Sequence, residues 1–417
     1  MVWSAERPSG QWPRYDGWVT GQQNRFVVAP HQGTFEFSSF VEVYAQMGPA
    51  LVEPCEVEID FSRQHFFGPA GMVPMIAVIR DLCEKGWTVQ VVPPDSPSLE
   101  RYWVKAGWMA AIQGEVPPEV ESRSTFTPLY SYSDFKDLNP RIVTIMDVLV
   151  KVAEFNSGVL RAVEWCLNEL ADNVLVHSGG ATGWIQLIAR PKMHKVDLVV
   201  ADRGMGIRTS LQQAYPDLGS DEDALRLAIE QGVTRDKSIG QGNGLAGSLR
   251  IARAAKGFVN VASGSANLRL FDDGSVHDFD LFSYQGTIVT ITLPTEAPIE
   301  LGEALWGHAT STFEYSHVTQ DGIVFSLLKE ASGFGNRGSG EELAIKLRNI
   351  MNEFPQEHVI IDFEGVSTPS ASFLDEFLAK TIKYEGVTKF FSRFQFRNMS
   401  DFVRQTADAV IEQRLKA

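Results

Sequence analysis

Three short motifs between residues 165 and 245 constrain how this 417-residue chain can fold more than any other feature. The first, at residues 169–173, reads Glu-Leu-Ala-Asp-Asn and lies in an apolar helical pattern. The second, at 202–206, reads Asp-Arg-Gly-Met-Gly and ends a run of strand-forming residues; the third, at 240–245, reads Gly-Gln-Gly-Asn-Gly-Leu and precedes another helix. Each motif alone is weak, and only their order and combination predict that a helix, a strand end and a glycine-rich loop meet at one place.

The first motif places two polar side chains on one side of a helix. Glu169 and Asn173 are four residues apart, so both project into the same space. The Asn173 carboxamide offers a neutral oxygen to Mg²⁺, which takes few protein ligands besides waters and phosphates. The Glu169 carboxylate can deprotonate an attacking water or hydroxyl group. For an isolated Glu and Asn at this spacing, an exposed helix face is the simpler interpretation.

Asp202 follows the apolar strand pattern at 196–201, where a carboxylate is costly unless it is paired. The amino group of adenine is a suitable partner, whereas guanine presents a carbonyl at the same edge and would leave the acceptor unpaired. Gly204 and Gly206 allow the backbone to pass close to a base. A turn that simply ends a strand is an equally good interpretation of this motif taken alone.

Gly240, Gly242 and Gly244 precede a helix, and glycine freedom together with unpaired helical N–H groups predicts a phosphate cradle. The spacing fits neither a Walker loop nor a dinucleotide fingerprint. The long segment at 207–239 suits a lid that closes over a nucleotide, with Arg235 or Lys237 contacting the terminal phosphates. A solvated charge cluster explains residues 234–237 about as well.

The three motifs, followed by Gly286-Thr287 before a strand, resemble the N, G1 and G2 boxes of the GHKL superfamily of gyrase, chaperone, histidine-kinase and MutL-type ATPases. The resemblance covers residues 140–296 and implies a Bergerat-type α/β sandwich that uses ATP and Mg²⁺. It implies that Glu169 is catalytic, that Asn173 coordinates Mg²⁺ and that Asp202 reads adenine with support from Thr287. The implied ATP-binding residues are Asn173, Asp202, Gly204, Gly206, Ile207, Arg235, Lys237, Gly240, Gly242, Asn243, Gly244, Leu245 and Thr287.

Within the superfamily, a Glu at position 169 is typical of the ATPases and of the anti-sigma-factor serine kinases. Histidine kinases usually lack it, and no histidine-bearing pair of dimerisation helices is evident upstream in the sequence. These two features argue against a histidine kinase.

The segments on either side of the middle domain each show an alternating β/α pattern. Residues 57–62 resemble residues 360–365, which suggests two divergent copies of one fold. Residues 359–376 are similar to bacterial STAS-like domains of unassigned function and to the anti-sigma-factor antagonists that are phosphorylated on Ser. That resemblance implies Ser370 or Ser372 as a phosphoacceptor. The alternative is that Ser372 is a helix N-cap with Asp375 as its capping partner.

The expected fold is therefore α+β, with a central GHKL sandwich flanked by two small STAS-like α/β domains. The expected segments are an N-terminal arm (1–24), a STAS-like domain (25–113), a linker (114–139), the GHKL domain (140–296), a second linker (297–312) and a C-terminal STAS-like domain (313–417).

Composition restricts the partners and the compartment. A net charge of -15 and a pI near 5.1 argue against nucleic acid as the partner. Cys55, Cys83 and Cys166 have no metal-ligand spacing, which predicts reduced thiols in a cytoplasmic protein. No stretch approaches ~20 apolar residues and no apolar leader begins the chain, so neither a membrane span nor processing is expected.

Two main functions remain open from the sequence. The first is an ATP-hydrolysing switch that controls a protein partner through the STAS-like domains. The second is an anti-sigma-type Ser/Thr kinase that phosphorylates its own STAS-like domain or that of a partner. A third is a scaffold that binds ATP for stability alone. Homodimers are common in the superfamily, but no pattern in this chain requires one.

Overall fold

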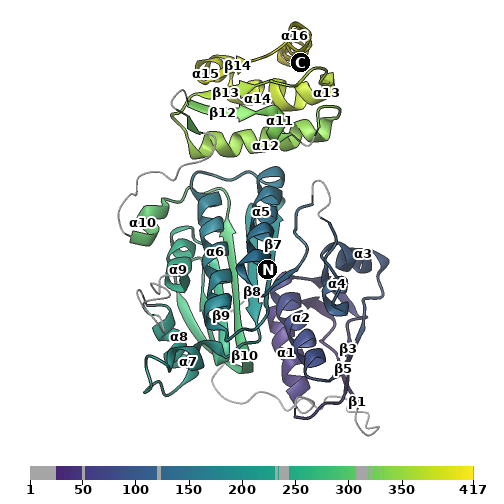
Figure 1. Ribbon diagram of the computed structural model, residues 1–417, viewed down its shortest axis with the longest axis vertical. Helices are drawn as coiled ribbons and strands as arrows, with labels where there is room; N and C mark the ends of the chain where they lie inside the picture. Colours follow the sequence, from purple (N-terminus) through teal and green to yellow (C-terminus); the bar gives the residue numbers. More distant parts are fainter. Residues whose placement is uncertain are drawn as a thin grey trace.

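The computed structural model describes residues 25–48, 52–119, 124–230, 233, 244–306, 318–319, 322–331 and 333–416. Mixed helices and strands form three units along the sequence, which confirms the expected α+β class (Figure 1). Within these ranges, no helix has both the length and the apolar character needed to cross a membrane.

The N-terminal unit is built on a three-stranded parallel sheet with the strand order β1-β3-β5. Its elements are β1 (Arg25–Val28), β2 (Gly33–Phe35), α1 (Phe37–Met47), β3 (Glu56–Asp60), β4 (Gln64–Phe67), α2 (Pro69–Glu84), β5 (Thr88–Val92), α3 (Pro97–Lys105) and α4 (Trp108–Gln113). Helix α2 is apolar on nearly all sides, with Met72, Met75, Ile76 and Ile79 fully or almost fully buried. A helix of this kind needs cover on more than one face.

The central unit contains a five-stranded antiparallel sheet with the strand order β6-β7-β8-β10-β9. Helices α5, α6 and α9 cover one face of this sheet (Figure 1). The elements are β6 (Tyr130–Tyr132), α5 (Phe135–Val152), α6 (Val159–His177), β7 (Gly183–Arg190), the short 3₁₀ turn η2 (Pro191–Met193), β8 (Lys195–Asp202), α7 (Gly206–Leu211), α8 (Asp221–Ala228), α9 (Gly244–Ala254), β9 (Phe258–Leu270), β10 (Val276–Pro294) and α10 (Leu301–Trp306).

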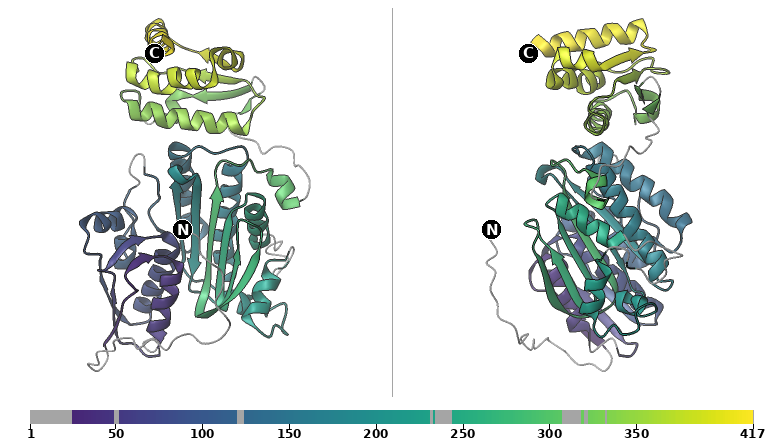
Figure 2. Two further views of the ribbon diagram at one scale, coloured as in Figure 1. Left: turned by 180° about the vertical axis from the view of Figure 1, so that it is seen from behind. Right: turned by 90° about the vertical axis from the view of Figure 1, so that its left-hand side faces the viewer.

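The N-terminal unit covers the opposite face of this sheet (Figure 2). Trp184, Ala201 and Ile288 of the sheet belong to the same hydrophobic cluster as the core of the N-terminal unit. The buried Gln186 of β7 joins the two units: its amide nitrogen donates to the carbonyl oxygen of Ala106 at 3.1 Å, and its oxygen accepts from the Trp108 indole at 2.8 Å. The resemblance implied an α/β sandwich for the central domain, and helix α2 of the N-terminal unit adds a layer on the other face of its sheet.

The third unit repeats the arrangement of the first. Strands β12, β13 and β14 run parallel, and β11 joins their edge in the antiparallel direction. The elements are β11 (Val318–Thr319), β12 (Gly322–Ser326), α11 (Leu327–Glu330), α12 (Arg337–Glu353), β13 (Val359–Asp362), α13 (Ala371–Leu374), the π-helical turn η3 (Asp375–Ala379), α14 (Lys380–Glu385), α15 (Val387–Arg393), β14 (Phe394–Arg397) and α16 (Asp401–Lys416).

The central strands of the two parallel sheets end in the same way. In β3, Oδ1 of Asp60 accepts a hydrogen bond from the amide of Ser62 at 2.8 Å. In β13, Oδ1 of Asp362 accepts one from the amide of Glu364 at 3.1 Å. This shared turn and strand order support the prediction of two related folds, as the sequence match at 57–62 and 360–365 suggested.

Parts of both predicted linkers are regular structure. Within 114–139, β6 pairs with β7 and α5 begins at Phe135. The helix begins there because Asp134 caps it, and Pro140, the predicted boundary, is accommodated inside it. Within 297–312, α10 packs through Leu305 on the central core. A three-residue strand and a six-residue helix are too short to show periodicity in a sequence.

Candidate nucleotide site

Helix α6 carries the polar pair of the first motif. Its buried side, including Leu170 and Val174, packs into the central core, while Glu169 and Asn173 are half-buried at its edge. The spacing of four residues therefore places both side chains on the same edge, as expected for a helix.

The first residue of α9 lies against both of these side chains. A Cβ atom built on Gly244 would stand 2.7 Å from Oε2 of Glu169 and 3.0 Å from Nδ2 of Asn173. The first distance is shorter than real Cβ contacts, so a larger residue at position 244 would require the ends of the Glu169 and Asn173 side chains to shift. The structure thus brings the last glycine of the third motif to the two polar residues of the first.

Asp202 is the last residue of β8 and is 4% exposed. Its Oδ1 accepts a hydrogen bond from the amide of Gly204 at 2.7 Å, and the amide of Thr287 donates to the same carboxylate. In the sheet, Asp202 lies directly between Gly183 of β7 and Thr287 of β10. Asp202 and Thr287, which the resemblance placed at the adenine, are therefore hydrogen-bonded neighbours.

The turn after Asp202 touches the carboxyl end of α6. A Cβ atom on Gly204 would lie 2.3 Å from the carbonyl oxygen of Ser178, and the Met205 amide donates to that oxygen at 2.9 Å. Gly206 has a positive φ of 76°, which favours glycine. Helix α6 is thus in contact with the second motif at its end and with the third motif nearer its middle.

Ser263 of β9 and Tyr284 of β10 support this turn and were not singled out from the sequence. The Ser263 hydroxyl accepts from the Ile207 amide at 2.9 Å and donates to the Gly286 carbonyl at 2.8 Å. The Tyr284 hydroxyl donates to the carbonyl oxygen of Asp202 at 2.9 Å. Neither residue lies in a recognisable motif, so the sequence carries no local signal for them.

The two carboxylates of the site have altered proton affinities. Burial raises the pKa of Glu169, and the neighbouring Asp172 charge raises it further. Burial raises the pKa of Asp202 to about 6, although the Gly204 and Thr287 amides and the Arg203 charge act in the opposite direction. Glu169 is therefore a better proton acceptor than an ordinary glutamate. The Asp202 carboxylate, which accepts from two amides, has lone pairs for a further donor.

The residues present fit a magnesium-bound nucleotide. The Asn173 carboxamide makes no hydrogen bond to another residue in the described part of the chain, so its oxygen can serve a ligand. Gly244 places the N-terminus of α9 beside Glu169 and Asn173, and a helix N-terminus is a favourable place for phosphates. Asp202 provides an acceptor of the kind that an adenine amino group would satisfy.

The remaining predicted site residues divide into two groups. Ile207 and Leu245 are partly buried and pack against the central core. The others, Arg235, Lys237, Gly240, Gly242 and Asn243, lie outside the described residues. The expected lid contacts and most of the phosphate loop therefore stay predictions.

The predicted phosphoacceptors lie at the start of α13. Ser370 is the N-cap of this helix, and its hydroxyl accepts from the Phe373 amide at 3.1 Å. The alternative assignment of the cap to Ser372 is therefore wrong, and Asp375 bonds to Arg414 instead of acting as a capping partner. The two serine hydroxyls are 3.1 Å apart.

Comparison with protein families gives two matches. Residues 158–297 match the family described as histidine kinase-, DNA gyrase B- and HSP90-like ATPases. Residues 339–404 match a STAS-like domain of unknown function. Neither match extends over residues 25–113, so the likeness of the N-terminal unit to STAS-like domains stays a prediction. Comparison with curated proteins gives no match. Residues 158–297 of this chain therefore form an ATP-using domain of the GHKL superfamily, and residues 339–404 form a STAS-like domain.

Proposed function

We propose that this chain is a Mg²⁺-dependent ATPase of the GHKL type, acting as a nucleotide-driven switch that controls a cytoplasmic protein partner through its STAS-like unit. The observation that carries the proposal is the fit of Gly244 against Glu169 and Asn173. This contact joins the glycine-rich motif to the two residues with the chemistry for hydrolysis. Asp202, at the turn that touches the end of α6, supplies the acceptor for adenine, and the Thr287 amide of β10 donates to its carboxylate.

Each polar residue of the site has its own task in this proposal. Glu169 holds the attacking water and takes its proton, an effect worth roughly 10²- to 10⁴-fold in rate. Asn173 gives one oxygen ligand to Mg²⁺, which would neutralise charge on the phosphate oxygens when bound. Asp202 accepts a hydrogen bond from the adenine amino group. The N-terminus of α9 is the part of the site that would bind the phosphates.

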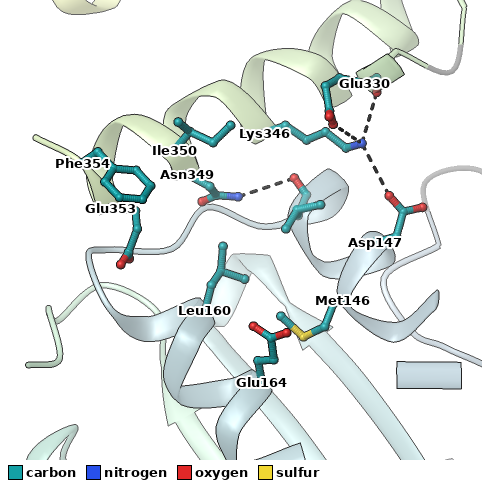
Figure 3. A pocket seen from close by; sticks show the side chains of 11 residues that line it. Met146, Asp147, Leu160, Glu164, Glu330, Lys346, Asn349, Ile350, Glu353 and Phe354 are labelled. Atoms are coloured by element: carbon teal, nitrogen blue, oxygen red, sulfur yellow. Dashed lines mark hydrogen bonds and ion pairs between the residues drawn. The ribbon is translucent and has the colours of Figure 1, made fainter. Parts of the chain in front are cut away.

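The route from this site to the STAS-like unit begins at the other end of α6. Helix α12 of the third unit lies across α5 and the start of α6 (Figure 3), and the loop between these two helices meets it at the Ala153 carbonyl, which accepts from Asn349. Glu353 of α12 accepts a hydrogen bond from the Gly158 amide at 2.7 Å and pairs with Arg161. Gly158 is the N-cap of α6, and as a glycine it has no side chain that could accept hydrogen bonds at the start of the helix. The third unit thus caps the helix that carries Glu169.

Asn349 makes the central contact of this interface. Its side-chain oxygen accepts from the Phe155 amide at 2.7 Å, and its nitrogen donates to the Ala153 carbonyl at 3.1 Å. Around it lie the ion pairs of Arg348 with Glu154 and of Lys346 with Asp147. Beside these contacts is a cavity of about 260 Å³ (Figure 3). Polar interfaces of this kind are typical of units that dock and separate, which a switch requires.

The same interface favours hydrolysis over transfer of phosphate to this chain's own STAS-like unit. Helix α12 holds that unit at Gly158, and Glu169 lies eleven residues further along α6, about 16 Å away. Ser370 is moreover used as a helix cap. Transfer of phosphate to Ser370 or Ser372 in the same chain would require the third unit to break the contacts between α12 and the central unit.

The proposal is tested by titration with ATP and Mg²⁺, followed by measurement of phosphate release and of labelled protein. We expect free phosphate and unlabelled protein. Label on the protein that is lost in Ser370→Ala or Ser372→Ala would support the kinase alternative instead. ATP binding without free phosphate and without labelled protein would support the third alternative, a scaffold that binds ATP for stability alone.

A Glu169→Ala variant should keep nucleotide binding and lose turnover by at least a hundredfold, because it removes only the proton acceptor. Asn168→Ala, at an exposed position on the same helix, is the matched control and should hydrolyse ATP like the wild type. Phosphate release at equal bound nucleotide is the measurement. A turnover in Glu169→Ala equal to that of the wild type would show that Glu169 is not the proton acceptor.

A further inference from the structure

Arg203 lies between Asp202 and Gly204 in the second motif, yet its side chain enters the N-terminal unit. That side chain is only 9% exposed. Neither the resemblance nor the proposed function gives it a task. Because a buried guanidinium needs partners for its charge and its donors, its contacts show what it connects.

The guanidinium of Arg203 is held mainly by two helices of the N-terminal unit. Its Nε and Nη2 atoms each lie 3.2 Å from Oδ2 of Asp81 on α2. Its Nη1 donates to the Tyr44 hydroxyl on α1 at 3.0 Å and to the Gln285 carbonyl at 3.0 Å. The group also lies over the rings of Tyr44 and Tyr284, at 5.5 and 5.0 Å from their centres.

These contacts lead back to the adenine acceptor along two paths. The Tyr284 ring under Arg203 belongs to the residue whose hydroxyl donates to the Asp202 carbonyl at 2.9 Å. Gln285, which accepts from Arg203, stands two residues before Thr287, whose amide donates to the Asp202 carboxylate. Both strands that hold the acceptor are thus fastened to the N-terminal unit through one side chain.

We infer that Arg203 is a positioning residue for adenine recognition, and that the N-terminal unit, through Asp81 and Tyr44, is part of the support of the nucleotide site. The inference rests on the proposed function, because it assumes that Asp202 reads adenine. It gives the N-terminal unit a specific role: any displacement of α1 or α2 from the sheet alters nucleotide affinity. By linkage, nucleotide binding then alters the stability of that contact to the same extent.

Arg203 also influences the charge of the acceptor. Its positive charge lowers the pKa of Asp202, against the larger raising effect of burial. Tyr132 of β6 and Tyr284 of β10 also interact electrostatically with Asp202, and burial keeps the pKa of both far above neutral pH. Asp81 of α2 and Tyr44 of α1 interact with Arg203. Loss of the guanidinium should therefore raise the pH below which Asp202 is protonated and adenine is poorly bound.

The test is calorimetric titration of the full chain with ATP and with GTP, each with Mg²⁺, at several pH values on both sides of 6. Arg203→Lys keeps the charge and loses the planar fork, so ATP affinity and the ATP-to-GTP ratio should each fall about tenfold. Arg203→Met removes the charge, and the pH midpoint of ATP binding should move upward. Asp81→Asn removes a charged partner of Arg203 and keeps the shape of the side chain. ATP affinity and the ratio of ATP to GTP affinity should each fall, by less than in Arg203→Lys.

Arg190→Lys is the matched control. Arg190 pairs with Asp197 and lies 6.0 Å from the centre of the Phe66 ring of the N-terminal unit, at the far end of β7 from the adenine turn. Its replacement should lower thermal stability and leave nucleotide selectivity unchanged. Arg203 variants could instead lose thermal stability but keep the wild-type ATP affinity, the ratio of ATP to GTP affinity and the pH midpoint of ATP binding. That result would overturn this inference and leave the proposed function intact. A wild-type chain that binds neither nucleotide would overturn the proposed function as well.

Discussion

The Asp202 side chain shows how much of this site depends on a single group. It is almost fully buried, it accepts from two backbone amides, and its pKa is about 6 because burial outweighs those donors. An adenine amino group would be a further donor. If that donor binds the ionised carboxylate, as the proposed function requires, ATP binding and proton release at Asp202 are coupled.

We predict that ATP binding weakens as the pH falls below about 6, by up to tenfold per pH unit, as Asp202 becomes protonated. Calorimetric titration across this range measures the effect. Asp202→Asn should show no inflection near pH 6. It should also improve GTP relative to ATP, because a carboxamide can donate to the guanine carbonyl. A wild-type affinity that is constant through pH 6, or that does not distinguish ATP from GTP, would contradict the assignment.

The same group should affect stability in the absence of nucleotide. Its pKa is raised from 3.8 to about 6 on folding, so between these values the folded state binds more protons than the unfolded state. The Asp202 contribution to the free energy of unfolding therefore decreases as the pH rises through this window, by roughly 3 kcal/mol in total. Urea unfolding of the wild type and of Asp202→Asn measures it as a difference. Parallel pH profiles of the two proteins would show that Asp202 does not titrate as described.

At this scale, the sequence predicts residues whose chemistry is visible in a motif. Asp202 and Gly244 could be identified because a carboxylate after an apolar strand and glycines before a helix each have a physical meaning of their own. Arg203, Ser263 and Tyr284 could not, because their roles arise from neighbours that are 23 to 159 residues away in the chain.

Among the elements, the N-terminus of α9 depends most directly on one residue type. Gly244 brings this helix so close to Glu169 and Asn173 that a methyl group at position 244 would displace the ends of both side chains. We predict that Gly244→Ala loses nucleotide affinity by at least tenfold, because the helix or the two side chains must move. Alanine favours a helix by about 1 kcal/mol over glycine, so the loss cannot come from helix propensity.

Gly219→Ala is the control for this change, since a Cβ there would meet only Oδ2 of Asp223 at 3.9 Å. It should bind nucleotide like the wild type. Direct titration of both variants with ATP and Mg²⁺ decides the matter. Equal nucleotide binding by Gly244→Ala and Gly219→Ala would show that the contact of Gly244 with Glu169 and Asn173 does not contribute to the nucleotide site.

Long elements with a clear period were predictable, and short or fully buried ones were not. The apolar helical pattern that carries the first motif corresponds to α6, and the alternating β/α patterns of the flanking segments correspond to the units that contain α2 and α12. Strand β6 was hidden because three residues among Ser and Pro show no period, and β14 followed a helix without a turn signal. That α2 also covers the central sheet could be seen only from its packing.

For the whole molecule, the sheet of the central unit is in contact with one flanking unit, and the α5–α6 loop with the other. The N-terminal unit shares a hydrophobic core with the sheet, whereas the third unit is held at α12 mainly by polar contacts. Apolar cores of this kind seldom open, while polar interfaces between domains do. The STAS-like unit is therefore the part that a nucleotide-driven switch would release.

Asn349→Asp tests this difference between the two contacts. The substitution keeps the acceptor for the Phe155 amide but turns a donor facing the Ala153 carbonyl into a carboxylate oxygen, at a site that is 4% exposed. A buried group left unpaired costs about 1 to 3 kcal/mol, so we predict at least fivefold faster hydrogen exchange at the amides of Phe155 and Gly158, which both donate to α12. Gln356→Glu makes the same chemical exchange at an exposed position beyond α12 and should leave both amides unchanged. If the third unit is the output of the switch, saturating ATP should also change their exchange in the wild type, and unaltered rates with ATP would exclude this route even if Asn349→Asp undocks the unit.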